Sequence, residues 1–211
     1  MACIEHFARQ PDANTADLLL FPECFLQGYL VVPEHLERHA IALHSDTFAS
    51  MRRRLARVRP TLVVGLIERD DGRYFNSAVV LAQGQILGTY RRTHLMPGES
   101  LFDPGDAYPI FDIGGVRFGI NICSDTQFPD AAAAVAAQGA QLLLVPSQNM
   151  MRRQAAVQWK DRHHQIRTAR ARATGMWLVS ADVTGERNDH HVGYGPTSII
   201  NSQAETRHRY R

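Results

Sequence analysis

The chain has 211 residues, of which 45% are hydrophobic and 21% are charged, and its formal net charge is +2 at pH 7. This length and composition are typical of a globular protein with one hydrophobic core, so we expect a single domain over residues 1–211. The small net charge argues against a nucleic-acid partner, and no apolar run approaches the roughly 18 residues that cross a bilayer.

Alternating apolar and polar residues predict strands, and longer amphipathic stretches predict helices, along the whole chain. The expected strands are residues 17–22, 61–68, 75–82, 85–91, 108–112, 116–123, 141–146, 176–181 and 195–201, and the expected helices are residues 33–42, 46–58, 129–138 and 153–174. Turns containing glycine, at residues 70–72 and 83–84, join successive strands as hairpins. Hairpins combined with helical crossovers predict an α/β fold with helices outside a mixed sheet.

Two of these strands end in charged residues. A proline stops the first strand, so that Glu23 emerges at its carboxyl end, where a base can be placed. The strand at 85–91 runs into Arg92 and His94, and a second carboxylate, Glu99, follows. Open α/β sheets collect their chemistry at one rim, so we expect these groups to converge there. His94 either lines the pocket or has a hydrogen-bonded structural role.

An arginine-rich run from Met51 to Arg59 lies between these strand ends in the sequence. Apolar residues at positions 48, 51, 55 and 58 have the spacing of an amphipathic helix. We interpret the run as a solvated outer face rather than a phosphate-binding patch.

Cys123 stands where an apolar strand gives way to a polar turn, before an alanine-rich helical pattern. A strand end fixes the sulfur in space, and backbone N–H groups of the turn can face a developing negative charge. The position therefore indicates a nucleophile, although a free cysteine is also commonly a small buried apolar residue. Gln148 and Asn149 follow the strand predicted at 141–146, and we expect them to line the same pocket.

Taken in this order and at these separations, the segments resemble the nitrilase superfamily of carbon-nitrogen hydrolases. The resemblance runs from about Ala16 to Asn201, and its most specific parts are Phe-Pro-Glu at 21–23 and Cys-x-Asp-x-x-Phe-Pro at 123–129. It implies an α-β-β-α sandwich with mixed sheets, whose subunits pair into a homodimer or a higher homo-oligomer. Measured against that family, we expect strands to be missing at both termini, which would uncover sheet edges and lower stability.

The resemblance also implies a Glu-Lys-Cys triad. It assigns Glu23 as the general base, Cys123 as the nucleophile and Glu99 as a supporting carboxylate. The lysine position falls on Arg92, which is always charged and can stabilise an oxyanion together with the backbone N–H of Ser124. Arginine is bulkier than lysine, however, and it cannot exchange protons.

The single lysine of the chain, Lys160, lies in an arginine-rich helical stretch, and we interpret it as a solvated surface charge. A general preference for arginine, 22 residues against one lysine, is an alternative account of Arg92.

These residues predict hydrolysis of a non-peptide carbon–nitrogen bond in a small amide, carbamoyl compound or nitrile, through a thioester on Cys123 and without a cofactor. Two alternatives stay open. The chain is a weak or inactive relative that serves as a binding or scaffold protein because of Arg92. Otherwise it is a transferase that passes the acyl group to an amine instead of water.

The other cysteines and the histidines suggest no further chemistry. Cys3, Cys24 and Cys123 are odd in number and form no CxxC pair, which argues against a disulfide framework or a zinc ribbon. Adjacent histidines at 163–164 and 190–191 lack the spacing of metal ligands, so we predict no metal site. The start of the chain lacks the apolar region of a secretion signal, and we expect a cytoplasmic protein.

Overall fold

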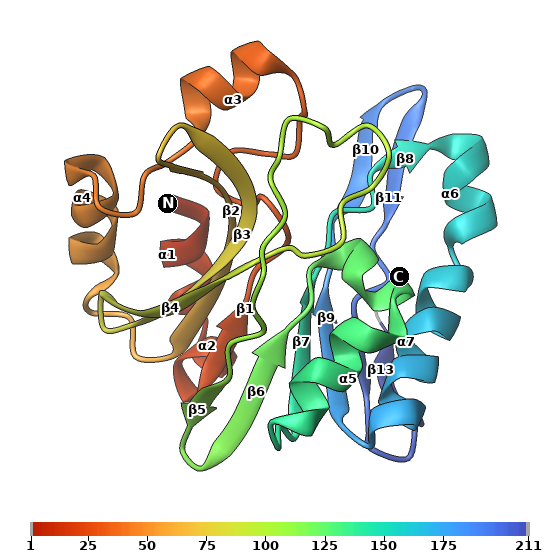
Figure 1. The fold of residues 1–211 in the computed structure, drawn as a ribbon. Coiled ribbons are helices and arrows are strands. Elements are labelled where there is room, and N and C mark those ends of the chain that lie inside the picture. Colours follow the sequence, from red (N-terminus) through yellow and green to blue (C-terminus); the bar gives the residue numbers. More distant parts are fainter. Residues whose placement is uncertain (1, 210–211) are drawn as a thin grey trace. The chain divides into compact units, whose positions relative to one another are not determined.

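The computed structural model describes residues 2–209 and divides along the chain into two compact units, Met1–Ala107 and Tyr108–Arg211. Figure 1 shows the elements of both units, coloured in chain order. Each unit has its own sheet, its own helices and its own hydrophobic cluster.

The first unit contains a four-stranded mixed sheet in the order β1-β2-β3-β4. Its strands are β1 (Leu18–Leu20), β2 (Thr61–Asp70), β3 (Arg73–Ala82) and β4 (Gln85–Arg91). β1 pairs parallel with β2, while the other two pairings are antiparallel. Both predicted hairpins are confirmed, and Asp71 and Gly72 in the first turn have φ values of 46° and 75°, the left-handed geometry that favours glycine there.

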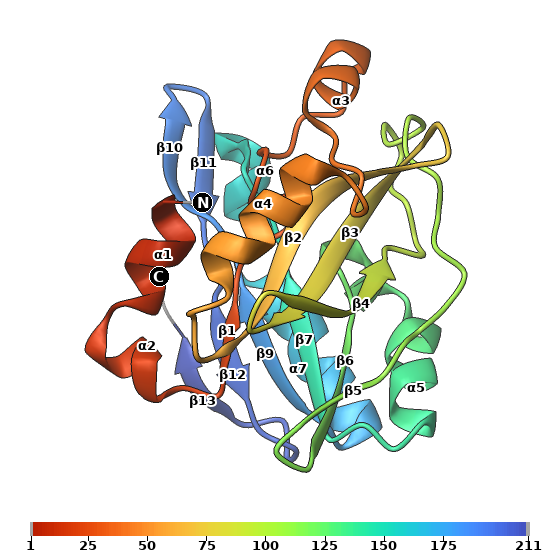
Figure 2. The ribbon, with the colours of Figure 1, turned by 90° about the vertical axis from the view of Figure 1, so that its left-hand side faces the viewer.

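Two helices of the first unit pack on one face of this sheet, as Figure 2 shows for α1 (Ala2–Ala8) and α4 (Asp46–Leu55). α4 begins after Ser45, whose hydroxyl oxygen accepts a hydrogen bond from the N–H of Phe48, as expected of an N-cap. Ile4 of α1 and Phe48 of α4 belong to one buried cluster with the inward-facing residues of β2 and β3. The remaining helices are α2 (Pro11–Thr15) and α3 (Pro33–His39).

The second unit contains a six-stranded mixed sheet in the order β13-β12-β9-β7-β6-β5. These strands are β5 (Phe111–Ile113), β6 (Val116–Ile120), β7 (Leu142–Pro146), β9 (Trp177–Ala181), β12 (Ser198–Ile200) and β13 (Thr206–Arg209). The central strands β6, β7 and β9 are parallel, which places their carboxyl ends at one edge. A smaller sheet, in the order β10-β11-β8, is formed by β8 (Met151–Arg152), β10 (Thr184–Asn188) and β11 (His191–Tyr194).

Two helices also cover one face of the six-stranded sheet, α5 (Pro129–Ala137) and α7 (Arg162–Thr174) (Figure 1). Their small residues Ala132 and Ala171 pack with Leu143 of β7 and Leu178 of β9 in one buried cluster. A 3₁₀ helix, η1 (Cys123–Gln127), precedes α5, and α6 (Arg153–Trp159) precedes α7.

The predicted α/β class with mixed sheets is confirmed, but several boundaries were wrong. The helix expected at 153–174 is two helices. Arg209 of β13 donates to the carbonyl of Lys160 at 3.2 Å and to Asp161 Oδ1 at 2.8 Å. The Lys160 carbonyl at the junction is therefore bonded to a side chain. The strand expected at 116–123 ends at Ile120, and the strand expected at 195–201 begins only at Ser198. In the described part of the chain, no helix is long and apolar enough to cross a membrane.

Four stretches carry elements that the hydrophobic pattern did not predict. They are residues 2–15, 151–152, 184–194 and 206–209. The strand β10 is exposed along its whole length, so it has no apolar alternation to reveal it.

Candidate active site

A buried cation lies between two buried carboxylates in the first unit. Nη1 of Arg92 donates to Oε1 of Glu23 and to Oε1 of Glu99, each at 2.9 Å. Each of the three side chains is no more than 3% exposed. Nε of Arg92 donates to the carbonyl of His94 at 3.1 Å. The structure thus brings three of the four predicted catalytic residues into contact.

The turn after β1 presents Glu23. Cys24, the next residue, has φ 47°, a left-handed conformation that costs a non-glycine residue about 1–3 kcal/mol and is found mainly where the surroundings require it. Asn76 of β3 holds the turn, because its Nδ2 donates to Glu23 Oε1 at 2.6 Å and its Oδ1 accepts from the Cys24 thiol at 3.6 Å. Cys24 is fully buried, so its side chain packs in the interior and supports Asn76.

The end of β4 separates two neighbouring arginines. Side chains alternate along a strand, and Arg91 accordingly leaves the site and pairs with Glu68 and Asp70, both at 2.6 Å. Its guanidinium also lies 3.9 Å from the centre of the Phe75 ring. Arg92 points the other way, into the cluster, and its backbone N–H donates to the carbonyl of Asn76 at 2.9 Å.

Glu99 receives two further donors. The Tyr29 hydroxyl donates to Glu99 Oε1, and the backbone N–H of Met96 donates to Oε2. Burial, and next the charges of Glu23 and Glu99, raise the pKa of Tyr29 far above its ordinary value. Tyr29 therefore stays protonated and remains a donor to Glu99.

Cys123 opens η1 in the second unit with φ 46°, a strained left-handed conformation. The fully buried Asp125 holds this turn, because its Oδ2 accepts from the N–H of Ile122 at 2.8 Å while its own N–H donates to the Ile122 carbonyl at 3.0 Å. The Thr126 hydroxyl donates to the Cys123 carbonyl at 2.7 Å. A sharp turn after a parallel strand is a geometry that presents a nucleophile at a sheet edge.

A buried polar chain runs behind the Cys123 sulfur. The thiol donates to Oδ1 of Asn149 at 3.7 Å. Asn149 is held by Asp182, which accepts from its backbone N–H at 2.9 Å and from its Nδ2 at 2.5 Å. Arg167 of α7 is paired with Asp182 at 3.1 Å, and both side chains are almost completely buried.

The predicted binding residues have different surroundings. Ser124 is 4% exposed in η1, beside Cys123. The carbonyl of His94 accepts from Arg92, and its Nδ1 lies 3.0 Å from the Thr93 hydroxyl. Gln148 Oε1 accepts from the N–H of Met150 at 3.3 Å. Of this set, Asn149 has a side-chain hydrogen bond to the cysteine, and the substrate-binding roles remain predictions.

Sequence reasoning missed Tyr29, Asn76, Asp182 and Arg167. Asp182 follows directly after β9, as Glu23 follows shortly after β1, so the rule that selected Glu23 would have found it. Arg167 carries no such signal, because it stands among five other arginines between residues 152 and 172.

Lys160 differs from the prediction of a solvated charge. It is half-buried, and its Nζ lies 5.0 Å from the centre of the Tyr194 ring. The Tyr194 ring explains this placement, because the aliphatic part of the lysine side chain can pack beside it while the ammonium group makes a cation–π contact with the ring face. Among the described residues, no group of three or more histidine, cysteine or acidic side chains is arranged to hold a metal ion.

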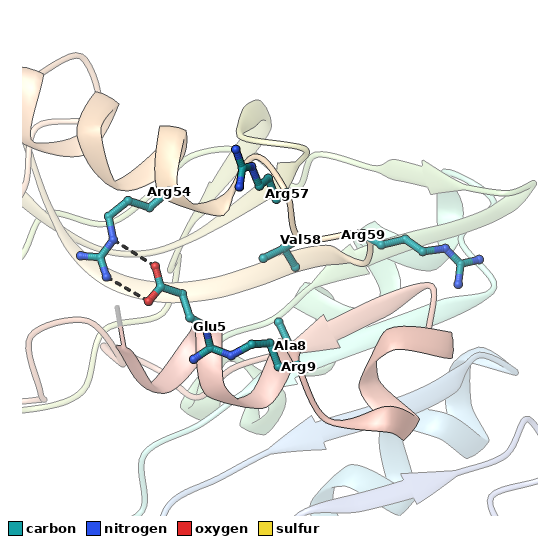
Figure 3. Close-up of a pocket in the computed structure, with 7 residues that line it drawn as sticks. All are labelled: Glu5, Ala8, Arg9, Arg54, Arg57, Val58 and Arg59. Carbon is teal, nitrogen blue, oxygen red and sulfur yellow. Dashed lines mark hydrogen bonds and ion pairs between the residues drawn. The ribbon is translucent and has the colours of Figure 1, made fainter.

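A basic hollow of about 440 Å³ lies in the first unit beside α1 and the end of α4, and contains none of the predicted catalytic residues. Figure 3 shows Arg54 facing Glu5, to which it donates at 2.9 and 3.0 Å, while Arg59 points away from the others. The arginines do not converge on one point (Figure 3), which supports the interpretation of residues 51–59 as an outer face.

Comparison with known proteins identifies similar sequences. The carbon-nitrogen hydrolase family matches residues 1–207. An "(R)-stereoselective amidase" from a Pseudomonas species is 32% identical over 189 residues, which is 89% of this chain and 66% of that protein. A protein named "Nitrilase" from Pyrococcus abyssi is 30% identical over 186 residues, 86% of this chain and 68% of that protein. The chain spans about two thirds or less of the length of several such relatives.

Solved structures have the same fold. An amidase of the nitrilase superfamily from Nesterenkonia AN1 superposes with a TM-score of 0.83 at 26% identity, covering 99% of this chain and 79% of that one. In another structure of the Nesterenkonia amidase, at TM-score 0.80 and 26% identity over 97% of this chain and 80% of that one, acrylamide has added to the active-site cysteine.

Proposed function

Because the chain belongs to the carbon-nitrogen hydrolase family, we propose that it hydrolyses a non-peptide carbon–nitrogen bond, with Cys123 as the nucleophile and Glu23 as the general base. The substrate class is a small amide, carbamoyl compound or nitrile, and amides rank first. Relatives named as amidases and nitrilases support this class.

One observation carries the proposal. Cys123 follows the parallel strand β6 and has a left-handed backbone conformation, in a turn that the buried Asp125 fixes. A strained cysteine with rigid backbone N–H groups around it is what a thiol nucleophile with an oxyanion site requires. Within the first unit, the buried Glu23–Arg92–Glu99 cluster contains a carboxylate and a permanent cation, the two groups that the proposed mechanism needs besides the thiol.

The first half-reaction forms the thioester. Glu23 takes the thiol proton, the sulfur forms a bond to the carbonyl carbon, and the π electron pair moves to oxygen, where Arg92 and the Ser124 N–H stabilise it. When that pair returns, the carbon–nitrogen bond breaks. Glu23 gives its proton to the departing nitrogen, which leaves as ammonia or an amine.

The second half-reaction restores the enzyme. Glu23 takes a proton from water, the oxygen of water bonds to the thioester carbon, and the carbon–sulfur bond then breaks. The proton returns to sulfur, and the acid leaves. Both halves require the Glu23 carboxylate to reach the Cys123 sulfur during turnover.

An ammonia-release screen over amides, carbamoyl amino acids and nitriles tests the proposal. We expect release with the wild-type chain and none above background with Cys123→Ala. Cys3→Ala, which removes an exposed thiol, is the control and should leave the rate unchanged. Turnover that survives Cys123→Ala would rule out the thioester mechanism.

A binding or scaffold protein is the second candidate. The observation that favours it is the engagement of Arg92, whose Nη1 and Nε groups are already bonded to Glu23, Glu99 and the His94 carbonyl. Iodoacetamide distinguishes the two functions. If the site is active, iodoacetamide should alkylate Cys123 faster than the exposed Cys3. If the protein is catalytically inactive, the reagent should alkylate Cys3 first.

A further inference from the structure

We propose that Asp182 and Arg167 are positioning residues that hold the Asn149 carboxamide with its oxygen toward the Cys123 sulfur, and that Asn149 thereby selects substrates and reagents that carry an N–H group on the reacting carbon or on the carbon next to it. This inference rests on the proposed function. The inference adds to the proposed function a rule for substrate recognition, which residues of the second unit provide.

Asp182 determines the orientation of Asn149. An ionised carboxylate has acceptors and no donor, so the group of Asn149 that faces it must be the NH₂ group. Nδ2 of Asn149 donates to Asp182 Oδ2 at 2.5 Å, and the backbone N–H of the same residue donates to Oδ1 at 2.9 Å. Oδ1 of Asn149 is then left on the side of Cys123, where it accepts from the thiol at 3.7 Å.

Arg167 holds the Asp182 carboxylate in place. Its guanidinium is 2% exposed and donates to Asp182 Oδ2 at 3.1 Å, to the Ser147 hydroxyl at 2.9 Å and to the Ser180 hydroxyl at 3.1 Å. The N–H of Val183 donates to Asp182 Oδ1 at 2.9 Å, so Asp182 is held from two sides. Buried polar chains with every member satisfied are rigid, which makes a rotation of Asn149 costly.

An acceptor beside the nucleophile discriminates between reacting groups. When Cys123 gives up its proton, Oδ1 of Asn149 loses its donor and becomes available. The N–H of a carboxamide whose carbon is the reacting carbon, as in an amide substrate, or the carbon next to it, as in iodoacetamide, can replace that donor. An ester places oxygen lone pairs at the same point and leaves the buried acceptor unsatisfied, which costs binding free energy.

A pair of alkylating reagents tests this rule on the intact chain without requiring turnover. Iodoacetamide and methyl iodoacetate both let the Cys123 sulfur bond to the methylene carbon while iodide leaves, and they differ in an NH₂ or an OCH₃ group. The rate ratio of amide to ester is measured at Cys123 by peptide mass spectrometry. It is normalised to the ratio at the exposed Cys3.

We expect Asn149→Ala to lower the normalised ratio roughly tenfold, the typical effect of one lost hydrogen bond to a buried group. Asp182→Asn should lower it as well, because the Asn149 carboxamide can then turn its NH₂ group toward the sulfur. Asp189→Asn, the same change at an exposed position in the β10–β11 turn, should leave the ratio unchanged. A purely structural role would slow both reagents equally and would not move the ratio.

A ratio unchanged within about twofold in Asn149→Ala would overturn the inference. This variant keeps the Asp182–Arg167 pair, so it remains informative if Asp182→Asn fails to fold. The outcome is independent of the proposed function. A chain that releases no ammonia from any amide can still show the selective alkylation, and an active chain can lack it.

Discussion

At Arg92, one buried guanidinium pairs with two buried carboxylates, Glu23 and Glu99. A buried ion pair is weak evidence of net stabilisation, but removing its cation leaves charges without compensation. Nε of the same guanidinium satisfies the carbonyl of His94 at 3.1 Å. The planar guanidinium of Arg92 therefore bonds to three partners. The ammonium group of a lysine would have to reach the same partners with a different geometry.

Arg92→Met should lower the free energy of unfolding by about 3–5 kcal/mol, because it leaves two carboxylates buried without their cation. Arg92→Lys keeps the charge and should cost about 1 kcal/mol through the lost bond to the His94 carbonyl. Urea unfolding at pH 7 measures both. Arg54→Met is the matched control, since Arg54 forms an exposed pair with Glu5 that is worth at most about 1 kcal/mol. Equal losses for Arg92→Met and Arg54→Met would contradict this account.

His163 makes the second unit sensitive to acid. Burial first, and the charge of Arg167 second, lower the pKa of His163 from its ordinary 6.5 to about 4, while Asp182 acts in the opposite direction. The ring stacks on Trp159 at 5.0 Å between centres. The folded state therefore resists protonation that the unfolded chain accepts.

The free energy of unfolding should consequently fall as pH decreases from about 6.5 to about 4, because unfolding takes up the His163 proton in that window. His163→Phe preserves an aromatic ring and removes the proton site, so it should reduce the slope by up to about 1.4 kcal/mol per pH unit. Urea unfolding at several pH values gives the slope. An exposed-site control, His190→Phe, should keep the wild-type slope.

At the scale of elements, β2 supports the turn that carries Glu23. A Cβ on Gly65 would lie 2.2 Å from the carbonyl oxygen of Pro22 and 2.7 Å from Cα of Glu23, both of which are backbone atoms. Such contacts cannot be relieved by a rotation of a side chain. The absence of a side chain at Gly65 is therefore a condition for the position of the base.

Gly65→Ala should displace the Glu23 turn and lower kcat about a hundredfold, the usual result of a shift of about 1 Å at a reacting group. The rate of ammonia release, measured with the best amide of the screen, reports this effect. Val79→Ala removes bulk from the buried cluster that β2 and β3 form with α1 and α4, to which Gly65 does not belong, so it should cost stability and leave kcat near that of the wild type. A kcat for Gly65→Ala equal to that of Val79→Ala would refute the role of the close approach.

At the scale of the whole molecule, the chain forms two compact units with separate clusters, while the family match extends across both. The proposed mechanism draws its carboxylate and cation from the first unit and its thiol from the second. We therefore retain the prediction of a single domain and expect the units to unfold as one.

The two tryptophans, Trp159 and Trp177, both belong to the second unit, so their fluorescence reports the unfolding of that unit. Leu66→Ala in the first unit and Leu178→Ala in the second each remove a fully buried side chain and should cost about 2–5 kcal/mol. If the units unfold together, Leu66→Ala will shift the tryptophan transition as much as Leu178→Ala does. A tryptophan transition unmoved by Leu66→Ala would show independent domains.

Much of the fold was predictable because its signals are local. Alternation of apolar residues found the main strands, and glycine turns found both hairpins of the first unit. The split of the helix at 153–174 was not predictable, since it depends on Arg209, almost fifty residues later in the chain.

The candidate site divides in the same way. The sequence by itself predicted Glu23, Arg92, Glu99 and Cys123 as the catalytic residues, because strand ends and the motifs that flank them consist of consecutive residues. Only the tertiary structure decided that Arg92 lies between both carboxylates, and that hydrogen bonds link Arg167 through Asp182 and Asn149 to the Cys123 thiol. These contacts join side chains that are distant in sequence, and their geometry depends on packing and burial, which no local pattern records.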